Sequence, residues 1–215
     1  MILYSEDSSP FSAVVRAAIY AKGAAIPIEP PPGGLRSDEY RALTGTGTVP
    51  CLMLDDGTPL PESTVILAYL DEKIPAPPLM PAGVEARARA ALLMRLGMGG
   101  IVDALVGFFH DLSTGAPNAR ETVLERLTTG LARIEHFLAA DGYAAGPAFS
   151  LADCVLGPAL MGVPMIGGMA GAPDLLSRYP KLTAYAPRVS AHPAVAKVLA
   201  ELQVALAANP LPGEA

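Results

Sequence analysis

A proline-rich segment at residues 74–81 divides the chain into two parts with different patterns. Proline has no backbone N–H to donate and fixes φ, so a helix or a central strand does not run through such a segment. The sequence therefore predicts two domains joined by a linker. We place the two domains at residues 1–76 and 84–215. The prolines of the segment are Pro75, Pro77, Pro78 and Pro81.

Short apolar runs alternate with helical patterns in the first domain. A strand–helix–strand crossover predicts parallel pairing, and the Asp56-Gly57 turn predicts an antiparallel hairpin. The expected order is βαβαββα, an α/β domain with one small mixed sheet and helices on its faces. Strands are expected at residues 2–4, 26–29, 51–54 and 58–60, and helices at residues 10–22, from residue 37, and at residues 62–73.

Every pattern after the linker has helical spacing, which predicts an all-α helical bundle. Residues 154–173 carry no charge and are long enough to span a bilayer, but they contain five glycines and three prolines. Basic residues do not flank this run closely, as membrane orientation requires, so we expect a buried central helix and no membrane partner. Helices are expected at residues 84–111, 119–140, 150–168, 174–190 and 193–208.

Composition excludes several classes of protein. With 51% apolar and 17% charged residues the chain is not disordered, and a net charge of −6 argues against nucleic acid as a partner. Its two cysteines, Cys51 and Cys154, lie far apart and give neither a disulfide framework nor a metal-ligand spacing. From this cysteine usage we expect no metal site and a reducing compartment. The N-terminus also lacks the basic residues of a signal peptide, so we expect a cytoplasmic protein.

The first expected helix begins at a site suited to an anion. Pro10 is at the first helical position and Ser9 at the cap, with Ser8 before it. Exposed N–H groups at a helix N-terminus stabilise a thiolate or another anion. Ser9 therefore either caps its own helix only or also serves such an anion.

Two further segments have the same ambiguity. Pro50 lies between a loop and a strand, where it is either an ordinary trans proline or a cis proline that presents the Val49 backbone to an extended ligand. Glu62 and Ser63 open the next helix, where they either cap it or hold the ammonium and carboxylate of an amino acid.

Taken in order, these signals resemble those of the cytosolic glutathione S-transferase family. The resemblance covers nearly the whole chain, and a serine in the first motif is typical of the theta and zeta classes. It implies a thioredoxin-like N-terminal domain and a helical C-terminal domain. The motifs that carry it are Ser9-Pro10-Phe11, Val15-Arg16, Lys22-Gly23, Gly47-Thr48-Val49-Pro50, Pro61-Glu62-Ser63, Phe149-Ser150-Leu151-Ala152-Asp153 and Tyr179-Pro180-Lys181-Leu182.

The resemblance implies roles at matching positions in the binding of glutathione, the expected cosubstrate. The Val49 backbone would pair with its cysteinyl part, ahead of a cis Pro50. Glu62 and Ser63 would hold the γ-glutamyl group, and Arg36 would meet a glutathione carboxylate.

The resemblance also implies the chemistry. Ser9, or Ser8 in a different register, would donate its hydroxyl to the glutathione sulfur, and the thiolate would attack a small apolar electrophile held by the helical domain. The implied activity is glutathione transfer, and a homodimer is expected. The alternatives are a glutathione-dependent isomerase, dehalogenase or ether-cleaving enzyme, or a non-catalytic binding protein. Zeta members carry Ser-Ser-Cys where this chain has Ser9-Pro10-Phe11, which departs from the isomerase pattern.

Overall fold

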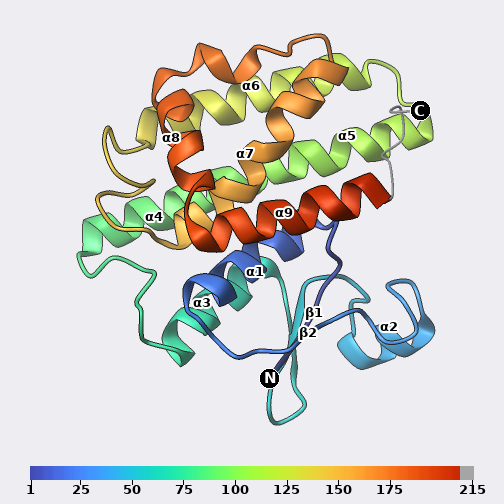
Figure 1. The fold of residues 1–215 in the computed structure, drawn as a ribbon. Helices are drawn as coiled ribbons and strands as arrows, with labels where there is room; N and C mark the ends of the chain where they lie inside the picture. Colours follow the sequence, from blue (N-terminus) through green and yellow to red (C-terminus); the bar gives the residue numbers. More distant parts are fainter. Residues whose placement is uncertain (209–215) are drawn as a thin grey trace.

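A computed structural model describes residues 1–208 of the chain. Its N-terminal part is a four-stranded mixed sheet with helices packed against it (Figure 1). The predicted order βαβαββα is confirmed. The elements are β1 (Ile2–Tyr4), α1 (Pro10–Ala21), β2 (Ile28–Glu29), α2 (Asp38–Thr44), β3 (Cys51–Met53), β4 (Pro59–Pro61) and α3 (Ser63–Lys73).

The sheet has the order β2-β1-β3-β4. β1 pairs parallel with β2 and antiparallel with β3, and β3 pairs antiparallel with β4. β2 is shorter than the predicted run at residues 26–29. Pro27 explains the difference, because its carbonyl accepts a 2.8 Å bond from the Leu3 N–H but it has no N–H to return.

The C-terminal part is helical, as predicted. The long helix expected at residues 84–111 is continuous but contains a π-helical turn at the Gly99-Gly100 pair. α6 crosses this turn closely, since a Cβ on Gly130 would lie 2.5 Å from the Gly100 carbonyl oxygen. The elements are α4 (Val84–Gly97), η1 (Met98–Val102), α5 (Asp103–Thr114), α6 (Ala119–Phe137), α7 (Leu151–Met169), η2 (Leu175–Arg178), α8 (Pro180–Ser190) and α9 (Pro193–Ala208).

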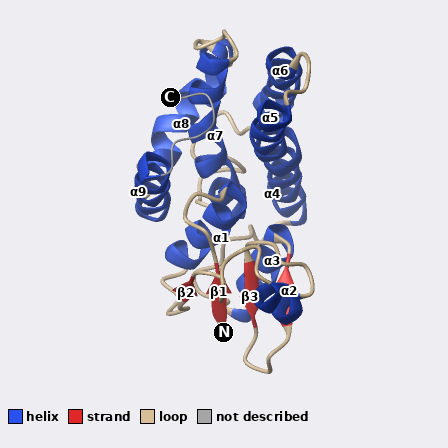
Figure 2. Ribbon diagram, turned by 90° about the vertical axis from the view of Figure 1, so that its right-hand side faces the viewer, coloured by secondary structure: helices blue, strands red, loops and turns tan. Residues whose placement is uncertain are grey.

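Helix α7 forms the centre of the bundle, between α8 and α9 on one side and α4 to α6 on the other (Figure 2). Two helical stretches, Val84–Thr114 and Leu151–Met169, are long and apolar enough to cross a membrane. In the α7 stretch 78% of the apolar window is buried inside the protein, against 50% in the other. The prediction of a buried central helix is therefore confirmed for α7.

Helix α1 connects the two parts, because it packs against α3 of the sheet part and against α7 and α9 of the bundle (Figure 1). The linker is tied to the C-terminal end of α1 by Lys22, which is buried. Its ammonium donates to the carbonyls of Ile74 and Pro77 at 2.7 and 2.9 Å and forms a 2.7 Å ion pair with Asp71. At the other end of α1, Pro10 lines a cavity together with residues of α5, α7 and α9, so the N-terminal end of α1 lies against the bundle.

Candidate functional site

The strand register brings three of the predicted motifs together at one end of the strands. Tyr4, Cys51 and Pro61 lie opposite one another on the neighbouring strands β1, β3 and β4. Residues 5–9, here called the serine loop, follow β1 at this end, and Pro50 directly precedes β3. Glu62 and Ser63 directly follow β4. Along the chain, Ser9 lies 40 residues before Val49 and 53 residues before Glu62.

Ser9 caps α1, as its position before Pro10 predicts. Its Oγ accepts a 3.2 Å hydrogen bond from the Ser12 N–H, while the Phe11 N–H has no hydrogen-bond partner in the described part of the chain. A hydroxyl accepts through a lone pair and keeps its own hydrogen for donation. Capping therefore leaves the Ser9 O–H free to donate to an anion at the end of the helix.

Ser8 is more exposed than Ser9 and lines two cavities that Ser9 does not line. Neither hydroxyl donates a hydrogen bond to any of residues 1–208. The structure therefore keeps both serines available as donors, with Ser9 at the helix end and Ser8 facing the cavities.

One of these cavities, here called the apolar cavity, has a volume of about 100 Å³ between α1, α5, α7 and α9. Met161 and Met165 of α7 lie in its wall, where their flexible side chains can adapt to different ligands. Apart from Ser8, its lining residues are Pro10, Leu105, Val106, Phe109, Pro158, Met161, Gly162, Met165, Ile166, Leu202 and Leu206.

The second cavity has a volume of about 410 Å³ and lies between the serine loop and the end of β2. Three carboxylate side chains line it, from Glu6, Asp7 and Glu29. Among the described residues, neither this acidic cavity nor the apolar cavity has a Lys, Arg or His in its lining. Asp7 forms a 2.8 Å ion pair with the buried Arg16, whereas the carboxylates of Glu6 and Glu29 have no ion-pair partner among residues 1–208. These two carboxylates disfavour an anionic second ligand near Ser8.

The Val49–Pro50 peptide bond is cis. The half-buried Val49 has an N–H and a C=O that form no hydrogen bond with other described residues. The preceding carbonyl, of Thr48, accepts a 2.9 Å bond from the Tyr40 hydroxyl, and burial raises the pKa of Tyr40, which keeps this donor protonated. The free backbone groups of Val49 fit an extended, peptide-like ligand.

Glu62 precedes α3 with φ 71° and ψ 111°, a conformation that is rare for a residue with a side chain. Glu62 is the N-cap residue of α3, but its side chain makes no capping hydrogen bond, and its exposed carboxylate forms no hydrogen bond within residues 1–208. The N–H groups of Ser63, Thr64 and Val65 also have no acceptors there. Ser63 is buried. The site therefore offers a carboxylate for an ammonium group and free N–H groups for a carboxylate.

Arg36 is placed differently from the other predicted site residues. It is exposed in the loop between β2 and α2, and within the described residues it forms no hydrogen bond or ion pair. No hydrogen bond or ion pair within residues 1–208 joins it to the serine loop, Val49 or Glu62, so its role toward a glutathione carboxylate stays a prediction.

The two cysteines are core residues. Cys51 and Cys154 are buried and unpaired with one another, and burial raises the pKa of both thiols. A raised pKa makes a thiol a poor nucleophile at neutral pH. The chemistry of the site therefore does not come from these residues.

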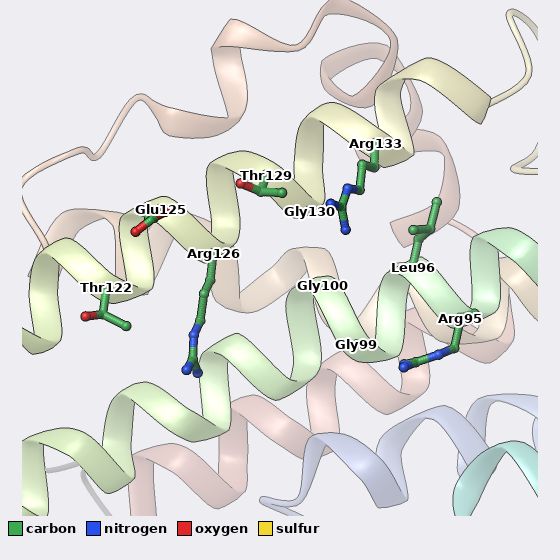
Figure 3. A pocket seen from close by; sticks show the side chains of 10 residues that line it. All are labelled: Arg95, Leu96, Gly99, Gly100, Thr122, Glu125, Arg126, Thr129, Gly130 and Arg133. Atoms are coloured by element: carbon green, nitrogen blue, oxygen red, sulfur yellow. The ribbon is translucent and has the colours of Figure 1, made fainter.

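A third cavity, of about 540 Å³, shares no lining residue with the serine loop. It lies between α6 and the α4–η1 segment, and Figure 3 shows Arg126 and Arg133 pointing into it from α6 and Arg95 lying along α4 below Gly99. None of the three arginines forms an ion pair with residues 1–208. We call this cavity the arginine groove; no sequence motif indicated it.

Comparison with known proteins identifies the fold. A family model described as "Glutathione S-transferase, N-terminal domain" matches residues 3–78, and one described as "Glutathione S-transferase, C-terminal domain" matches residues 105–201. The chain belongs to the glutathione S-transferase family. The resemblance read from the sequence and the predicted fold class, a thioredoxin-like domain followed by a helical one, are thereby confirmed.

Several members of the family are similar over most of the chain. A stringent starvation protein A homolog of Coxiella burnetii is 33% identical over 171 residues, 78% of each chain. A maleylacetoacetate isomerase of Pseudomonas aeruginosa is 30% identical over 207 residues, 90% of this chain and 93% of its own. Similarity thus extends both to isomerases and to proteins named for a starvation response.

Solved structures show the same fold. A glutathione S-transferase of Methylobacterium radiotolerans, in complex with glutathione sulfonate, has a TM-score of 0.77 and 27% identity, covering 91% of this chain and 92% of its own. A maleylacetoacetate isomerase of Methylobacterium extorquens, with bound malonate and glutathione, has a TM-score of 0.74 and 29% identity, covering 92% and 95%. Members of this family use glutathione.

Proposed function

We propose that this protein is a glutathione transferase that holds glutathione where the ends of β1, β3 and β4 meet and presents its sulfur to an uncharged electrophile. The observation that carries the proposal is the register of β1, β3 and β4, which brings the serine loop, Val49 and the start of α3 together beside the apolar cavity. Bound glutathione supplies the sulfur nucleophile. Its backbone pairs with Val49, and its γ-glutamyl group binds Glu62 and Ser63, with Arg36 toward a carboxylate.

The chain can supply the energy that ionisation of the sulfur needs. A free thiol has a pKa of about 8.5, and lowering it by about two units requires about 2.7 kcal/mol of differential interaction. One hydroxyl hydrogen bond to a charged acceptor contributes about 1.5–3 kcal/mol, and a helix N-terminus adds up to about 1 kcal/mol. The Ser9 O–H together with the free Phe11 N–H is therefore sufficient, and Ser8 is the alternative donor.

The cavity linings favour an uncharged second substrate. Apolar side chains surround the apolar cavity, and the unpaired carboxylates of Glu6 and Glu29 lie on the other side of Ser8. An anionic electrophile would be desolvated there without a basic partner, which costs free energy. We therefore expect activity with an apolar aryl halide or an uncharged enone in preference to a dicarboxylate.

A glutathione-dependent isomerase is the second candidate. The similarity to the maleylacetoacetate isomerase of P. aeruginosa over 90% of the chain favours it, whereas Pro10 and Phe11 in place of Ser-Cys do not. Dehalogenation and ether cleavage by glutathione belong to the same group of alternatives. Product analysis separates them: a transferase leaves the sulfur bonded to the product, whereas an isomerase changes the substrate and leaves the amount of glutathione unchanged.

A non-catalytic binding protein is the third candidate; one similar protein, the stringent starvation protein A homolog of C. burnetii, has a name that states no enzymatic activity. Two measurements on the same preparation test all three. Retention on immobilised glutathione measures binding, and turnover with an aryl halide, an enone and a maleyl keto acid measures catalysis. Binding with conjugate formation supports the transferase; binding without turnover of any substrate supports the non-catalytic protein.

We also propose that two copies pair through the face formed by α3, α4 and α6. The guanidinium groups of Arg95, Arg126 and Arg133 have no ion-pair partner among residues 1–208, and Glu72 of α3 lines a neighbouring cavity together with Arg95. A two-fold axis through this face would place Glu72 of one copy against the arginines of the other.

We also expect the protein to be cytoplasmic, because both cysteines are buried and free.

Light scattering during size-exclusion chromatography tests the pairing. Arg126→Glu reverses one charge in the arginine groove and is expected to shift the protein from dimer to monomer. Arg178→Glu, a similar change on η2 outside the groove, is the control and should stay dimeric. A monomeric wild-type protein, or an Arg126→Glu variant as dimeric as the control, would contradict the proposed interface.

A further inference from the structure

Arg16 lies in the middle of α1 and is completely buried. A buried charge is costly unless it is paired and hydrogen-bonded, and the serine loop supplies most of the partners. Nη1 donates to Ser5 Oγ at 3.0 Å, to the Glu6 carbonyl at 3.1 Å and to Asp7 Oδ1 at 2.8 Å, and Nη2 donates to the Asp7 carbonyl at 2.9 Å. One guanidinium therefore holds three consecutive residues directly before Ser8.

The remaining edge of the same guanidinium faces helix α9. Nε of Arg16 lies 3.2 Å from Oε2 of Glu201, and neither atom has a hydrogen-bond partner in the described residues. The other carboxylate oxygen, Oε1, accepts a 2.7 Å bond from the Tyr20 hydroxyl, and burial together with this bond raises the pKa of Tyr20. The Lys197 ammonium lies 3.8 Å from the centre of the Tyr20 ring. α9 is thus fixed to α1 through charged groups.

The part of α9 that carries Glu201 also forms walls of the candidate site. Leu202 and Leu206 line the apolar cavity, and Ala205 lines the acidic cavity beside Ser8. A displacement of this part of α9 would therefore change the shape of both cavities and the anchorage of Arg16 together.

We propose that Arg16 is a positioning residue for the serine loop and that its ion pair with Glu201 couples the loop to the α9 wall of the apolar cavity. One buried guanidinium then fixes the serine hydroxyl that contacts the sulfur relative to the α9 wall that contacts the electrophile. This inference rests on the proposed function for its kinetic consequence, but the link between α9 and the loop is a property of the fold.

The variant Glu201→Gln tests the link. Glutamine keeps the length of the side chain and an oxygen that accepts from Tyr20, but removes the charge that faces Arg16. Glu121→Gln on α6 is the matched control, because Glu121 is exposed and its side chain forms no ion pair or hydrogen bond with residues 1–208. We expect kcat/KM for the electrophile to fall about tenfold in Glu201→Gln, with the KM for glutathione within about twofold of wild type.

Hydrogen exchange gives a readout that does not need activity. In Glu201→Gln, the hydrogen-bonded amides of Ser5, Ser9 and Ser12 should exchange faster than in wild type and in the control. Arg16→Lys should show the same change because one ammonium cannot serve all these acceptors. Unchanged exchange in a folded Glu201→Gln variant would overturn the inference, whatever its activity. Faster exchange in a protein that does not bind glutathione would support the link and contradict the proposed function instead.

Discussion

The Ser150 hydroxyl donates a 2.7 Å hydrogen bond to the carboxylate of Asp153 at the start of α7. The same carboxylate accepts from the backbone N–H groups of Ser150 and Ala144 and from the Tyr185 hydroxyl, each at 2.8 Å. Asp153 is fully buried, and burial raises its pKa. Its four donors, from three separate segments, make it the polar centre of the helical part, and Ser150 and Asp153 together form a capping box at the start of α7.

Replacing Asp153 by asparagine should destabilise the protein strongly. An amide offers one acceptor oxygen where the carboxylate has two, and its NH₂ group would face donors, so buried donors lose their partner. We expect the free energy of unfolding to fall by about 2–4 kcal/mol in urea titrations. Asp174→Asn, at the exposed start of η2, should change it by about 0.5 kcal/mol or less. Equal stability of the two variants would contradict this role.

His192 makes the stability of the fold depend on pH. Its ring stacks on Phe149 at 3.6 Å, its Nδ1 is buried without a partner among residues 1–208, and burial lowers its pKa below 6.5. The folded protein thus favours the neutral ring. The stability this confers is complete above the unfolded-state pKa of 6.5 and is lost as pH falls through the lower folded-state pKa.

The variant His192→Phe keeps an aromatic ring against Phe149 and removes the titration. Urea midpoints at about pH 7.5 and about pH 5.5 should differ more for the wild type than for the variant, with the wild type losing stability at the lower pH. Asp153, whose charge opposes the lowering of the His192 pKa, titrates with the opposite sign and is present in both proteins. Parallel pH profiles would exclude His192 as the source.

Glu62 should show opposite effects on stability and on binding. A non-glycine residue with φ 71° and ψ 111° carries a strain of about 1–3 kcal/mol, which glycine avoids. Glu62→Gly should therefore raise the free energy of unfolding by about 1 kcal/mol, after the greater entropy of glycine in the unfolded chain is counted. The KM for glutathione should rise about tenfold, because the carboxylate for its ammonium group is gone. A variant that is less stable, or that binds glutathione unchanged, would contradict this role.

Much of the fold follows from short-range signals. Ser9 and Pro10 indicate the start of α1, and the Asp56-Gly57 turn indicates the β3–β4 hairpin. The prolines of residues 74–81 indicate where the sheet part ends. These signals act through the local backbone, so a sequence reveals them without tertiary structure. The π-turn at Gly99-Gly100 was missed because its cause is the close crossing of α6, which belongs to another segment.

The segments that the fold brings together could be singled out from the sequence, but the contacts that connect them could not. Ser9, Val49 and Glu62 each have a local signature, whereas the hold of Arg16 on the serine loop and Glu201 depends on contacts up to 185 residues away. One signal was present: Arg16 interrupts an otherwise apolar run in α1, and a charge in such a position requires buried partners. The arginine groove left no comparable mark in the sequence.

The direct test of the proposed chemistry is an ultraviolet titration of the thiolate of glutathione bound to the protein. We expect a midpoint about two units below that of a free thiol at about 8.5, and a shift back toward that value in Ser9→Ala. Ser37→Ala removes the equivalent cap of α2 and should leave the midpoint unchanged. If Ser9→Ala kept the low midpoint and Ser8→Ala lost it, the donor would be Ser8. A wild-type protein whose bound glutathione titrates near 8.5 would contradict the proposed activation of the sulfur.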